Sequence, residues 1–280
     1  VSVNDVSVLT LTHTPVPYPA GTLITSWGVS GTPRGIAVDR QSNVYVTNVQ
    51  SDSVIKYSNT GTLLTQWGRE GTVAGDFKNP IGVAIDSDEY VFVTDDGNNR
   101  VQKFTSGGIF ISQFYAPGNL RSLAIDQSGY VYIVRDNDGT LYKYDSDGNR
   151  VTQWDIGANN WGIALDDAGN VYVGNGSGVD TTIMKFTSDG ELVSTIGKVV
   201  HDPAHPGSDE FKNPRGLATD HSGNLFLADN FNERILKFSP EGIFLAKWNN
   251  TNPYGIAVGP NGNVYVVNSD NNRITVYGGG

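Results

Sequence analysis

This chain of 280 residues has no cysteine, only four histidines and no long apolar run. Without cysteine it can form neither disulfides nor a catalytic thiolate. No apolar run approaches the roughly 20 residues of a membrane-spanning helix, so we expect no insertion into a membrane. Basic residues are also few: 19 Lys and Arg against 29 Asp and Glu give a net charge of -10. This balance disfavours nucleic acid as a partner, because phosphate backbones are bound by clustered basic residues.

An internal repeat is the main feature of the sequence. A segment of the type Gly-Ile-Ala-Val-Asp, followed by a turn and Val-Tyr-Val, occurs six times, beginning at Gly35, Gly82, Ser122, Gly162, Gly216 and Gly255. Subtracting successive start numbers gives spacings of 47, 40, 40, 54 and 39 residues. A period near 40 residues that contains strand-like segments is typical of a propeller.

The second repeat shows how each unit can form a blade. Residues 83–85, 90–94, 100–104 and 109–114 are rich in β-branched and aromatic residues or alternate polar and apolar, and they are separated by turn residues. Four antiparallel strands form one propeller blade. The sequence therefore predicts an all-β fold over residues 21–280, a six-bladed β-propeller with four-stranded antiparallel blades.

The sixth unit ends after its third strand, at Tyr277. A matching fourth strand occurs at the other end of the chain, where residues 21–28 nearly duplicate residues 61–68. We therefore expect the N-terminal strand to complete the last blade and to close the ring without an exposed inner edge. Residues 1–20 lie outside the repeat and are interpreted as an extension or a linker to a preceding domain.

Two further motifs resemble the NHL repeat. Asp-x-x-Asn-x-Arg precedes the third strand at residues 95–100 and 229–234, and a variant with Asn in the first position occurs at 268–273. Gly-x-Phe-x-x-Pro and its variant precede the first strand at residues 75–80 and 209–214. The resemblance covers residues 21–280 and implies a six-bladed propeller. NHL propellers include RNA-binding domains, peptide-amidating lyases, receptor sensors and protein-interaction modules, so the resemblance selects no function.

The residue before each repeated glycine is expected to face the mouth of the central channel, where propellers usually bind ligands. These positions hold Arg34, Ile81, Arg121, Trp161, Arg215 and Tyr254. Guanidinium groups with aromatic walls suit a carboxylate, a phosphate, a sugar or an acidic peptide side chain. The alternative is structural: each arginine would pair with an aspartate of a neighbouring blade, such as Asp95 or Asp229.

A second set of residues ends the second strands: Asn48, Asp95, Arg135, Asn175, Asp229 and Asn268. Their oxygens could hold Ca²⁺, as in related six-bladed hydrolases that bind a metal over the channel. The simpler interpretation is that they cap the following turn. Arg135 breaks the Asp/Asn pattern on the same blade as Arg121, so we include it among the candidate ligand-binding residues.

Residues for catalysis are few. The peptide-amidating lyases that this repeat resembles hold zinc with histidines at the channel mouth. The predicted first and second strands of this chain contain no histidine. His201 and His205 lie close together in the insertion at 198–214 without a third ligand. No cofactor is predicted beyond the calcium alternative. The third strands carry one lysine in each of five blades, which we expect to be solvated: Lys56, Lys103, Lys143, Lys185 and Lys237.

These features favour a non-catalytic module that binds a protein, a peptide or a small anionic or sugar ligand on its loop face. The acidic composition, rich in Thr and Asn, favours an extracellular or cell-surface location in a prokaryote. The competing interpretation is a metal-dependent lyase or hydrolase with its site at the same channel mouth.

Overall fold

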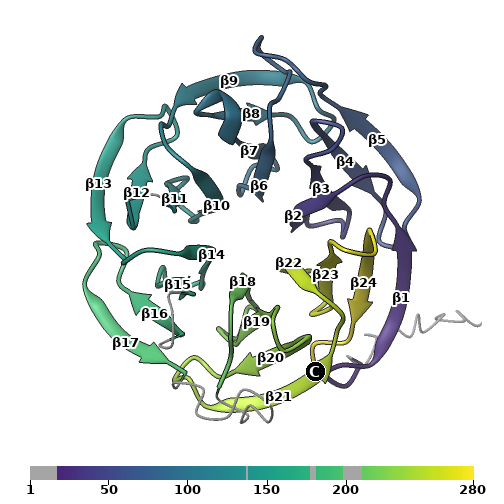
Figure 1. Cartoon of the computed structure of the whole chain (residues 1–280), viewed down its shortest axis with the longest axis vertical. Coiled ribbons are helices and arrows are strands. Elements are labelled where there is room, and N and C mark those ends of the chain that lie inside the picture. Colours follow the sequence, from purple (N-terminus) through teal and green to yellow (C-terminus); the bar gives the residue numbers. More distant parts are fainter. Residues whose placement is uncertain (1–17, 137, 177–180, 198–209) are drawn as a thin grey trace, which may run out of the picture.

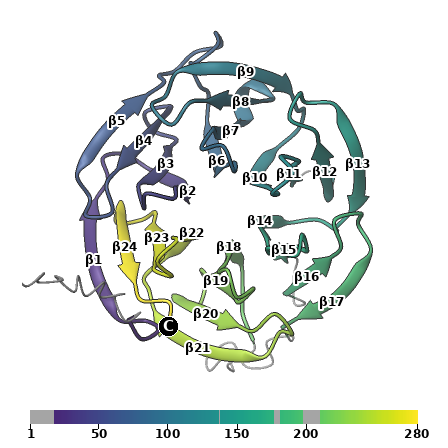
Figure 2. The same cartoon turned by 180° about the vertical axis from the view of Figure 1, so that it is seen from behind.

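The computed structural model describes residues 18–136, 138–176, 181–197 and 210–280. Within them, 24 strands form six antiparallel sheets of four strands, arranged in a ring around a central axis (Figure 1). The predicted six-bladed β-propeller is confirmed. In every blade the first strand lies nearest the axis and the fourth lies at the circumference, as both faces of the ring show (Figures 1 and 2). No helix of the described residues is long and apolar enough to cross a membrane.

The first five blades follow one another along the chain. Blade one contains β2 (Pro33–Val38), β3 (Val44–Asn48), β4 (Ser53–Tyr57) and β5 (Leu63–Trp67). Blade two contains β6 (Pro80–Ile85), β7 (Val91–Asp95), β8 (Arg100–Phe104) and β9 (Phe110–Tyr115). Blade three contains β10 (Leu120–Ile125), β11 (Val131–Arg135), β12 (Thr140–Tyr144) and β13 (Arg150–Asp155). Blade four contains β14 (Asn160–Leu165), β15 (Val171–Asn175), β16 (Thr182–Phe186) and β17 (Leu192–Ile196). Blade five contains β18 (Pro214–Thr219), β19 (Leu225–Asp229), β20 (Arg234–Phe238) and β21 (Phe244–Asn249).

Blade six joins the two ends of the described chain. It contains β22 (Pro253–Val258), β23 (Val264–Asn268), β24 (Arg273–Tyr277) and, as its outer strand, β1 (Leu23–Gly28). β1 pairs antiparallel with β24, with Trp27 opposite Ile274. Closure by an N-terminal strand is therefore confirmed. Of the predicted extension, residues 18–20 run beside the C-terminal glycines, where the Gly280 N–H donates to the Tyr18 carbonyl at 3.2 Å; residues 1–17 lie outside the described residues.

The hydrophobic core lies at the joints between blades. Second strands are buried because each is flanked by strands in its own sheet and covered by the neighbouring blades; every residue of β3, β7, β19 and β23 is buried. A typical cluster joins Ala37 and Tyr45 of blade one to Val83, Val91 and Phe104 of blade two. Burial of this apolar area, at roughly 25 cal/mol per Å², is what holds each blade to the next.

A glycine two residues before the outer strand fixes each joint. At Gly61, φ is +87°, and a Cβ there would lie 2.6 Å from the ring of Trp27 in the preceding blade. The same contact recurs around the ring, with Gly108 against Trp67, Gly148 against Phe114, Gly190 against Trp154, Gly242 against Ile196 and Gly21 against Trp248. The glycine therefore meets two needs at once, a left-handed turn and a backbone surface on which a large side chain packs.

The lysines of the third strands form a second link between blades. Lys56 Nζ lies 3.4 Å from Asp39 Oδ2 and 4.7 Å from the centre of the Tyr45 ring, and it donates to the Ser106 carbonyl of the next blade at 3.3 Å. The equivalent lysines reach carbonyls of the next blade in the same way: Lys143 to Ser188, Lys185 to Pro240 and Lys237 to Gly279.

The prediction that these lysines are solvated is therefore wrong. The Lys56 and Lys237 side chains are only 14% and 7% exposed. Each lysine lies on the polar side of its strand, as the alternation indicates, but the hairpin of the next blade covers that side. The aliphatic stems are buried while the ammonium groups reach acceptors.

The glycine contacts predict a specific cost of adding one methyl group. Gly61→Ala places a Cβ against Trp27, whereas Gly129→Ala places one at a similar φ of +84° with no atom within 4 Å. Both variants bear the backbone cost of a positive φ, and the first adds overpacking of about 1–3 kcal/mol. Urea denaturation should show this additional loss of unfolding free energy in Gly61→Ala. Equal losses in the two variants would show that the ring contact contributes nothing.

Ring closure predicts a loss of the monomeric fold when the closing strand is removed. Deleting residues 1–28 removes β1, its whole pairing with β24 and the contacts of the half-buried Trp27, which is a large loss against a total stability of about 5–15 kcal/mol. We expect an unfolded or strand-exchanged, oligomeric product by light scattering and circular dichroism. Deleting residues 1–17 is the control and should leave the melting temperature unchanged. A folded monomer lacking residues 1–28 would contradict the role of β1.

Candidate functional site

A β-bulge in each innermost strand positions the predicted mouth residues. The register of β2 against β3 shifts between Pro33 and Ile36, and the equivalent shift occurs in all six first strands. A bulge bends a strand and re-aims the side chain that it carries. Proline begins four of these strands, where an edge position makes the missing N–H harmless. The sequence Pro-Arg-Gly thus turns Arg34 toward the channel.

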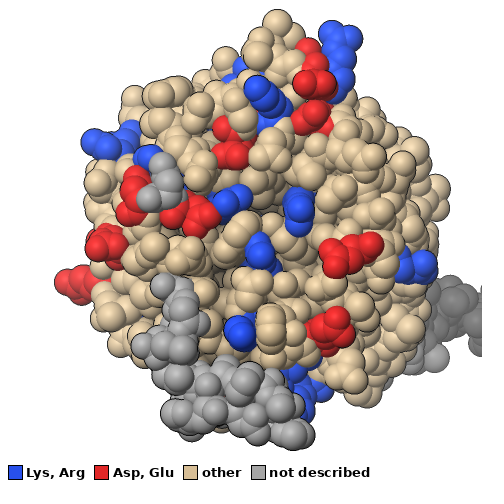
Figure 3. Space-filling model, in the orientation of Figure 1, with Lys and Arg blue, Asp and Glu red and all other residues tan. Residues whose placement is uncertain are grey.

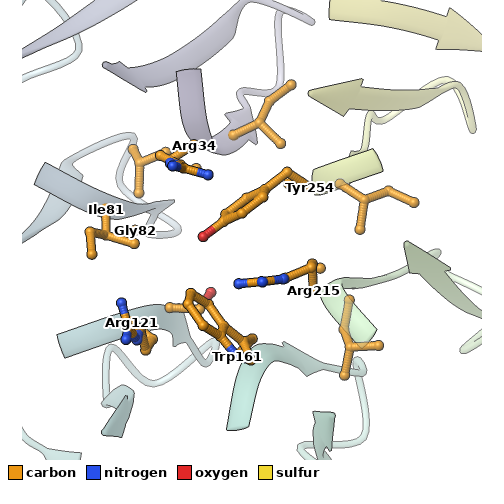
Figure 4. Close-up of a pocket in the computed structure, with 15 residues that line it drawn as sticks. Arg34, Ile81, Gly82, Arg121, Trp161, Arg215 and Tyr254 are labelled. Carbon is orange, nitrogen blue, oxygen red and sulfur yellow. The ribbon is translucent and has the colours of Figure 1, made fainter. Parts of the chain in front are cut away.

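The six mouth residues meet in one pocket at the loop face: Arg34, Ile81, Arg121, Trp161, Arg215 and Tyr254 (Figure 4). Ile36, Val83, Leu217 and Ile256 form an apolar floor beneath them. The cavity has a volume of about 50 Å³, which is room for about one or two water molecules. On the whole face, basic side chains gather around the centre of the ring (Figure 3).

Aromatic rings separate the three guanidinium groups. Trp161 lies between Arg121 and Arg215, whose guanidinium carbons are 4.0 and 3.8 Å from the ring centre (Figure 4). Tyr254 lies beneath Arg34 at 4.5 Å and also contacts Arg215 at 5.2 Å. The two rings meet edge to face, with centres 6.2 Å apart. Cation–π attraction of this kind contributes about 0.5–2 kcal/mol per pair and offsets part of the repulsion between the arginines.

The three arginines differ in their charge partners. Arg121 Nη2 lies 2.6 Å from Asp136 Oδ2, so its charge is paired. Among the described residues, no carboxylate oxygen lies within 4.0 Å of Arg34 or Arg215. Burial lowers the pKa of Arg215, and the charges of Arg34 and Arg121 act in the same direction, while the Tyr254 hydroxyl opposes them. Arg215 Nε is buried without a hydrogen-bond partner in the described part of the chain.

Asp95 and Asp229 do not relieve this repulsion, contrary to the structural alternative raised from the sequence. Each pairs with the arginine of its own NHL-like motif: Asp95 with Arg100 at 2.7 Å and Asp229 with Arg234 at 2.7 Å. Arg100 also donates to the carbonyls of Thr72, Val73 and Asp76. The motif arginine therefore anchors the long loop that leads into the inner strand of its own blade.

Arg135 does not join the other candidate residues. Its guanidinium pairs with Asp138 at 3.1 Å and covers the Tyr142 ring at 4.6 Å, and it is not among the residues that line the mouth. The end of a second strand lies farther from the axis than the bulge of a first strand, so the two positions cannot share a pocket. Blade three therefore has a comparable ion pair with the charges exchanged: the base, Arg135, is at the strand end, and the acid, Asp138, is in the following turn.

The calcium alternative finds no ligand cluster. Asn48 Oδ1 accepts the backbone N–H groups of Thr32 and Gln50 at 3.1 Å, which is the capping role. In the described ranges, no three His, Asp or Glu residues are grouped to hold a metal. His221 lies near the opposite mouth, 3.1 Å from Asp167. His13, His201 and His205 fall outside the described residues.

Comparison with known proteins assigns the family. A model of the NHL repeat matches residues 77–104, which include Phe77, Asp95 and Arg100, and residues 250–277, which span most of blade six. The protein is an NHL-repeat β-propeller. A search of curated proteins gave no match to this NHL propeller.

Solved structures similar to this NHL propeller have diverse functions. Virginiamycin B lyase from Staphylococcus aureus is 14% identical, with 91% of this chain and 98% of that chain covered and a TM-score of 0.64. The gluconolactonase XC5397 from Xanthomonas campestris is 14% identical, with coverages of 94% and 96% and a TM-score of 0.68. The WD40 repeats of RRP9 are 9% identical, with coverages of 93% and 99% and a TM-score of 0.70. At these identities the likeness shows the fold alone.

The unpaired charge at Arg215 predicts that this residue adds little stability. Arg215→Met should leave the unfolding free energy within about 0.5 kcal/mol of the parent or raise it, because no ion pair is lost. Arg100→Met is the matched comparison and should cost about 3–5 kcal/mol, because it leaves the fully buried Asp95 without its partner. Guanidinium denaturation measures both. A loss in Arg215→Met as large as that in Arg100→Met would make Arg215 a structural residue.

Proposed function

We propose that this NHL propeller is a non-catalytic binding module whose channel mouth takes an anionic group of a small ligand, a peptide or a protein. The observation that carries this proposal is the pair Arg34 and Arg215. Neither has a carboxylate partner among the described residues, and the second is partly buried with its Nε unpaired. A desolvated charge without a partner costs free energy, and a bound anion would remove that cost.

The aromatic rings support the same function. The guanidinium carbons of Arg215 and Arg34 lie 3.8 and 4.5 Å from the ring centres of Trp161 and Tyr254, and a guanidinium group in contact with a ring can still donate through its N–H groups. A carboxylate or phosphate accepts such donors in charge-assisted hydrogen bonds worth about 1.5–3 kcal/mol each. Because Arg121 is paired with Asp136, we assign the anion to Arg34 and Arg215, and Arg121 to holding Trp161 in place.

The lining of the mouth supports binding over catalysis. The lyase or hydrolase alternative draws support from the virginiamycin B lyase and gluconolactonase folds. General acid–base chemistry and metal ligation both need His, Asp, Glu or a similar group at the reacting atoms. Among the described residues, those that line the mouth include no His, Asp or Glu. We retain an extracellular or cell-surface location as part of the proposal, supported by the acidic, cysteine-free composition.

Titration of Trp161 fluorescence with acetate, phosphate and sulfate tests the function. We expect at least one anion to give a saturable change that is absent in Trp161→Phe. Arg34→Met and Arg215→Met should each weaken that binding by about 10- to 100-fold, the scale of one charge-assisted hydrogen bond. Arg40→Met is the charge-matched control, because Arg40 lines the opposite mouth and its side chain is 68% exposed. The function is wrong if no anion saturates, or if Arg40→Met weakens binding as much as Arg215→Met.

A further inference from the structure

The charged and aromatic side chains of the mouth form one alternating stack around the ring. Blades three, four, five, six and one contribute, in that order, Arg121, Trp161, Arg215, Tyr254 and Arg34 (Figure 4). The guanidinium carbons lie 4.0 and 3.8 Å from the centre of the indole ring and 5.2 and 4.5 Å from the centre of the phenol ring. Each aromatic ring therefore lies between two cations.

The stack leaves the N–H groups of the arginines as the main contacts for a ligand. A molecule that stacks on an aromatic ring needs a free ring face, and both rings of the mouth already have a guanidinium group on either side. Two backbone donors at the mouth are also used, because the Gly35 and Gly82 N–H groups donate to Thr47 Oγ1 and Thr94 Oγ1 at 2.8 and 2.7 Å. Recognition therefore depends on charge-assisted hydrogen bonds from guanidinium groups.

Two of the three guanidinium charges are uncompensated. Arg121 Nη2 lies 2.6 Å from Asp136 Oδ2, whereas in the described part of the chain no carboxylate oxygen lies within 4.0 Å of Arg34 or Arg215. A single monovalent anion neutralises one of these charges and leaves the other unpaired in a partly buried site, which costs free energy. Full compensation of the mouth needs two negative charges.

Tyr254 keeps the two uncompensated groups apart. It belongs to blade six, which lies between blade five with Arg215 and blade one with Arg34, and its side chain reaches toward the middle of the mouth (Figure 4). An anion hydrogen-bonded to one guanidinium group at about 2.7–2.9 Å would have to reach around the tyrosine to contact the other. Two anionic groups joined by a spacer can instead bind one on each side. Because the phenol ring centre is only 5.2 and 4.5 Å from the guanidinium carbons, a spacer of a few atoms suffices.

The small size of the cavity places the spacer outside it. A volume of about 50 Å³ is far below the roughly 300–1,000 Å³ of pockets that enclose a whole ligand. Only the anionic ends can therefore approach the arginines from the cavity, and the spacer crosses the open side of the mouth.

We propose that the mouth binds a ligand with two anionic groups, one at Arg34 and the other at Arg215, joined by a short spacer that passes over Tyr254. This inference rests on the proposed function and deepens it. Carboxylate and phosphate groups both meet the requirement, since both accept guanidinium N–H donors. The same chemistry occurs in a small molecule with an anion at each end and in an extended peptide, where acidic side chains two residues apart project from one face about 7 Å apart.

Isothermal titration with adipate and its monomethyl ester tests the second contact, because the two ligands share one chain and differ by one charge. Malonate, whose two carboxylates share one carbon atom, is the control for charge without separation. We expect adipate to bind at least about 10-fold more tightly than either of the other two ligands. In Arg34→Met and in Arg215→Met, adipate and its monomethyl ester should bind equally. Arg40→Met, at the opposite mouth, should keep the full difference.

Three outcomes decide between this inference and the proposed function. If malonate binds as tightly as adipate and both are weakened by Arg215→Met, two-point binding is wrong and anion binding stands. If the advantage of adipate survives in Arg34→Met, the second group binds elsewhere and the assignment is overturned. If none of the three ligands binds, both proposals fail.

A peptide with two glutamates separated by one alanine distinguishes the sources. Its comparison is a peptide of the same composition with adjacent glutamates, whose side chains project from opposite faces of an extended chain. If the spaced peptide binds more tightly than both this peptide and adipate, the ligand is an acidic peptide segment. If adipate binds more tightly than the spaced peptide, the ligand is a small molecule with two anionic ends.

Discussion

The propeller depends on the contact between the glycine before the outer strand of one blade and the large side chain of the blade before it. A four-stranded blade has two faces and cannot bury both by itself. The contact of Gly61 with Trp27 and its five equivalents bring neighbouring blades within packing distance. Because the blades form a closed ring, each joint constrains every other, and a single misfitting joint would shift the inner strands of all six blades (Figure 1).

The lysine and aspartate of a blade belong to one unit. Asp39 caps its turn by accepting the N–H groups of Gln41 and Asn43, and it also accepts the Tyr45 hydroxyl and lies near Lys56. Blade six has Gly259 and Val276 where the others have the acid and the lysine. Losing both together is expected, because either one alone would leave a largely buried charge without its partner.

The tyrosine of that unit responds to the same surroundings. Burial raises the pKa of Tyr45, and the charge of Asp39 and the hydrogen bond to it act in the same direction. The pKa values of Tyr132 and Tyr172 are raised for the same reasons: both side chains are buried, and each lies beside a carboxylate, Asp126 and Asp166 respectively. These hydroxyls therefore stay protonated at neutral pH and act as permanent donors to the carboxylates that cap the turns.

Much of this architecture could be predicted because short sequence patterns within each repeat determine the strands and turns, and the same patterns recur in every blade. Alternation and turn residues placed β8 at residues 100–104, as observed, while β6 begins at Pro80 instead of residue 83 because the bulge lengthens it. The six residues that line the mouth could also be predicted, because they occupy the same position in each of the six repeats. The pairing of Arg121 with Asp136, the burial of Arg215 and the covering of the lysines could not be predicted. These features depend on how far one blade covers the next. The alternation of polar and apolar residues shows which side of a strand is polar, but it does not show whether that side faces solvent or a neighbouring blade.

The two ends of the described chain meet in blade six, at the mouth opposite the arginines. The Gly280 N–H donates to the Tyr18 carbonyl, and Gly280 lines the cavity at the mouth that also contains Asp39 and Asp220. Arg34 and Arg215 line the other mouth. A tether fixed at either of these ends therefore leaves from the side that faces away from the arginines. Immobilised on a sensor surface through such a tether, the propeller would present its arginine mouth to the solution.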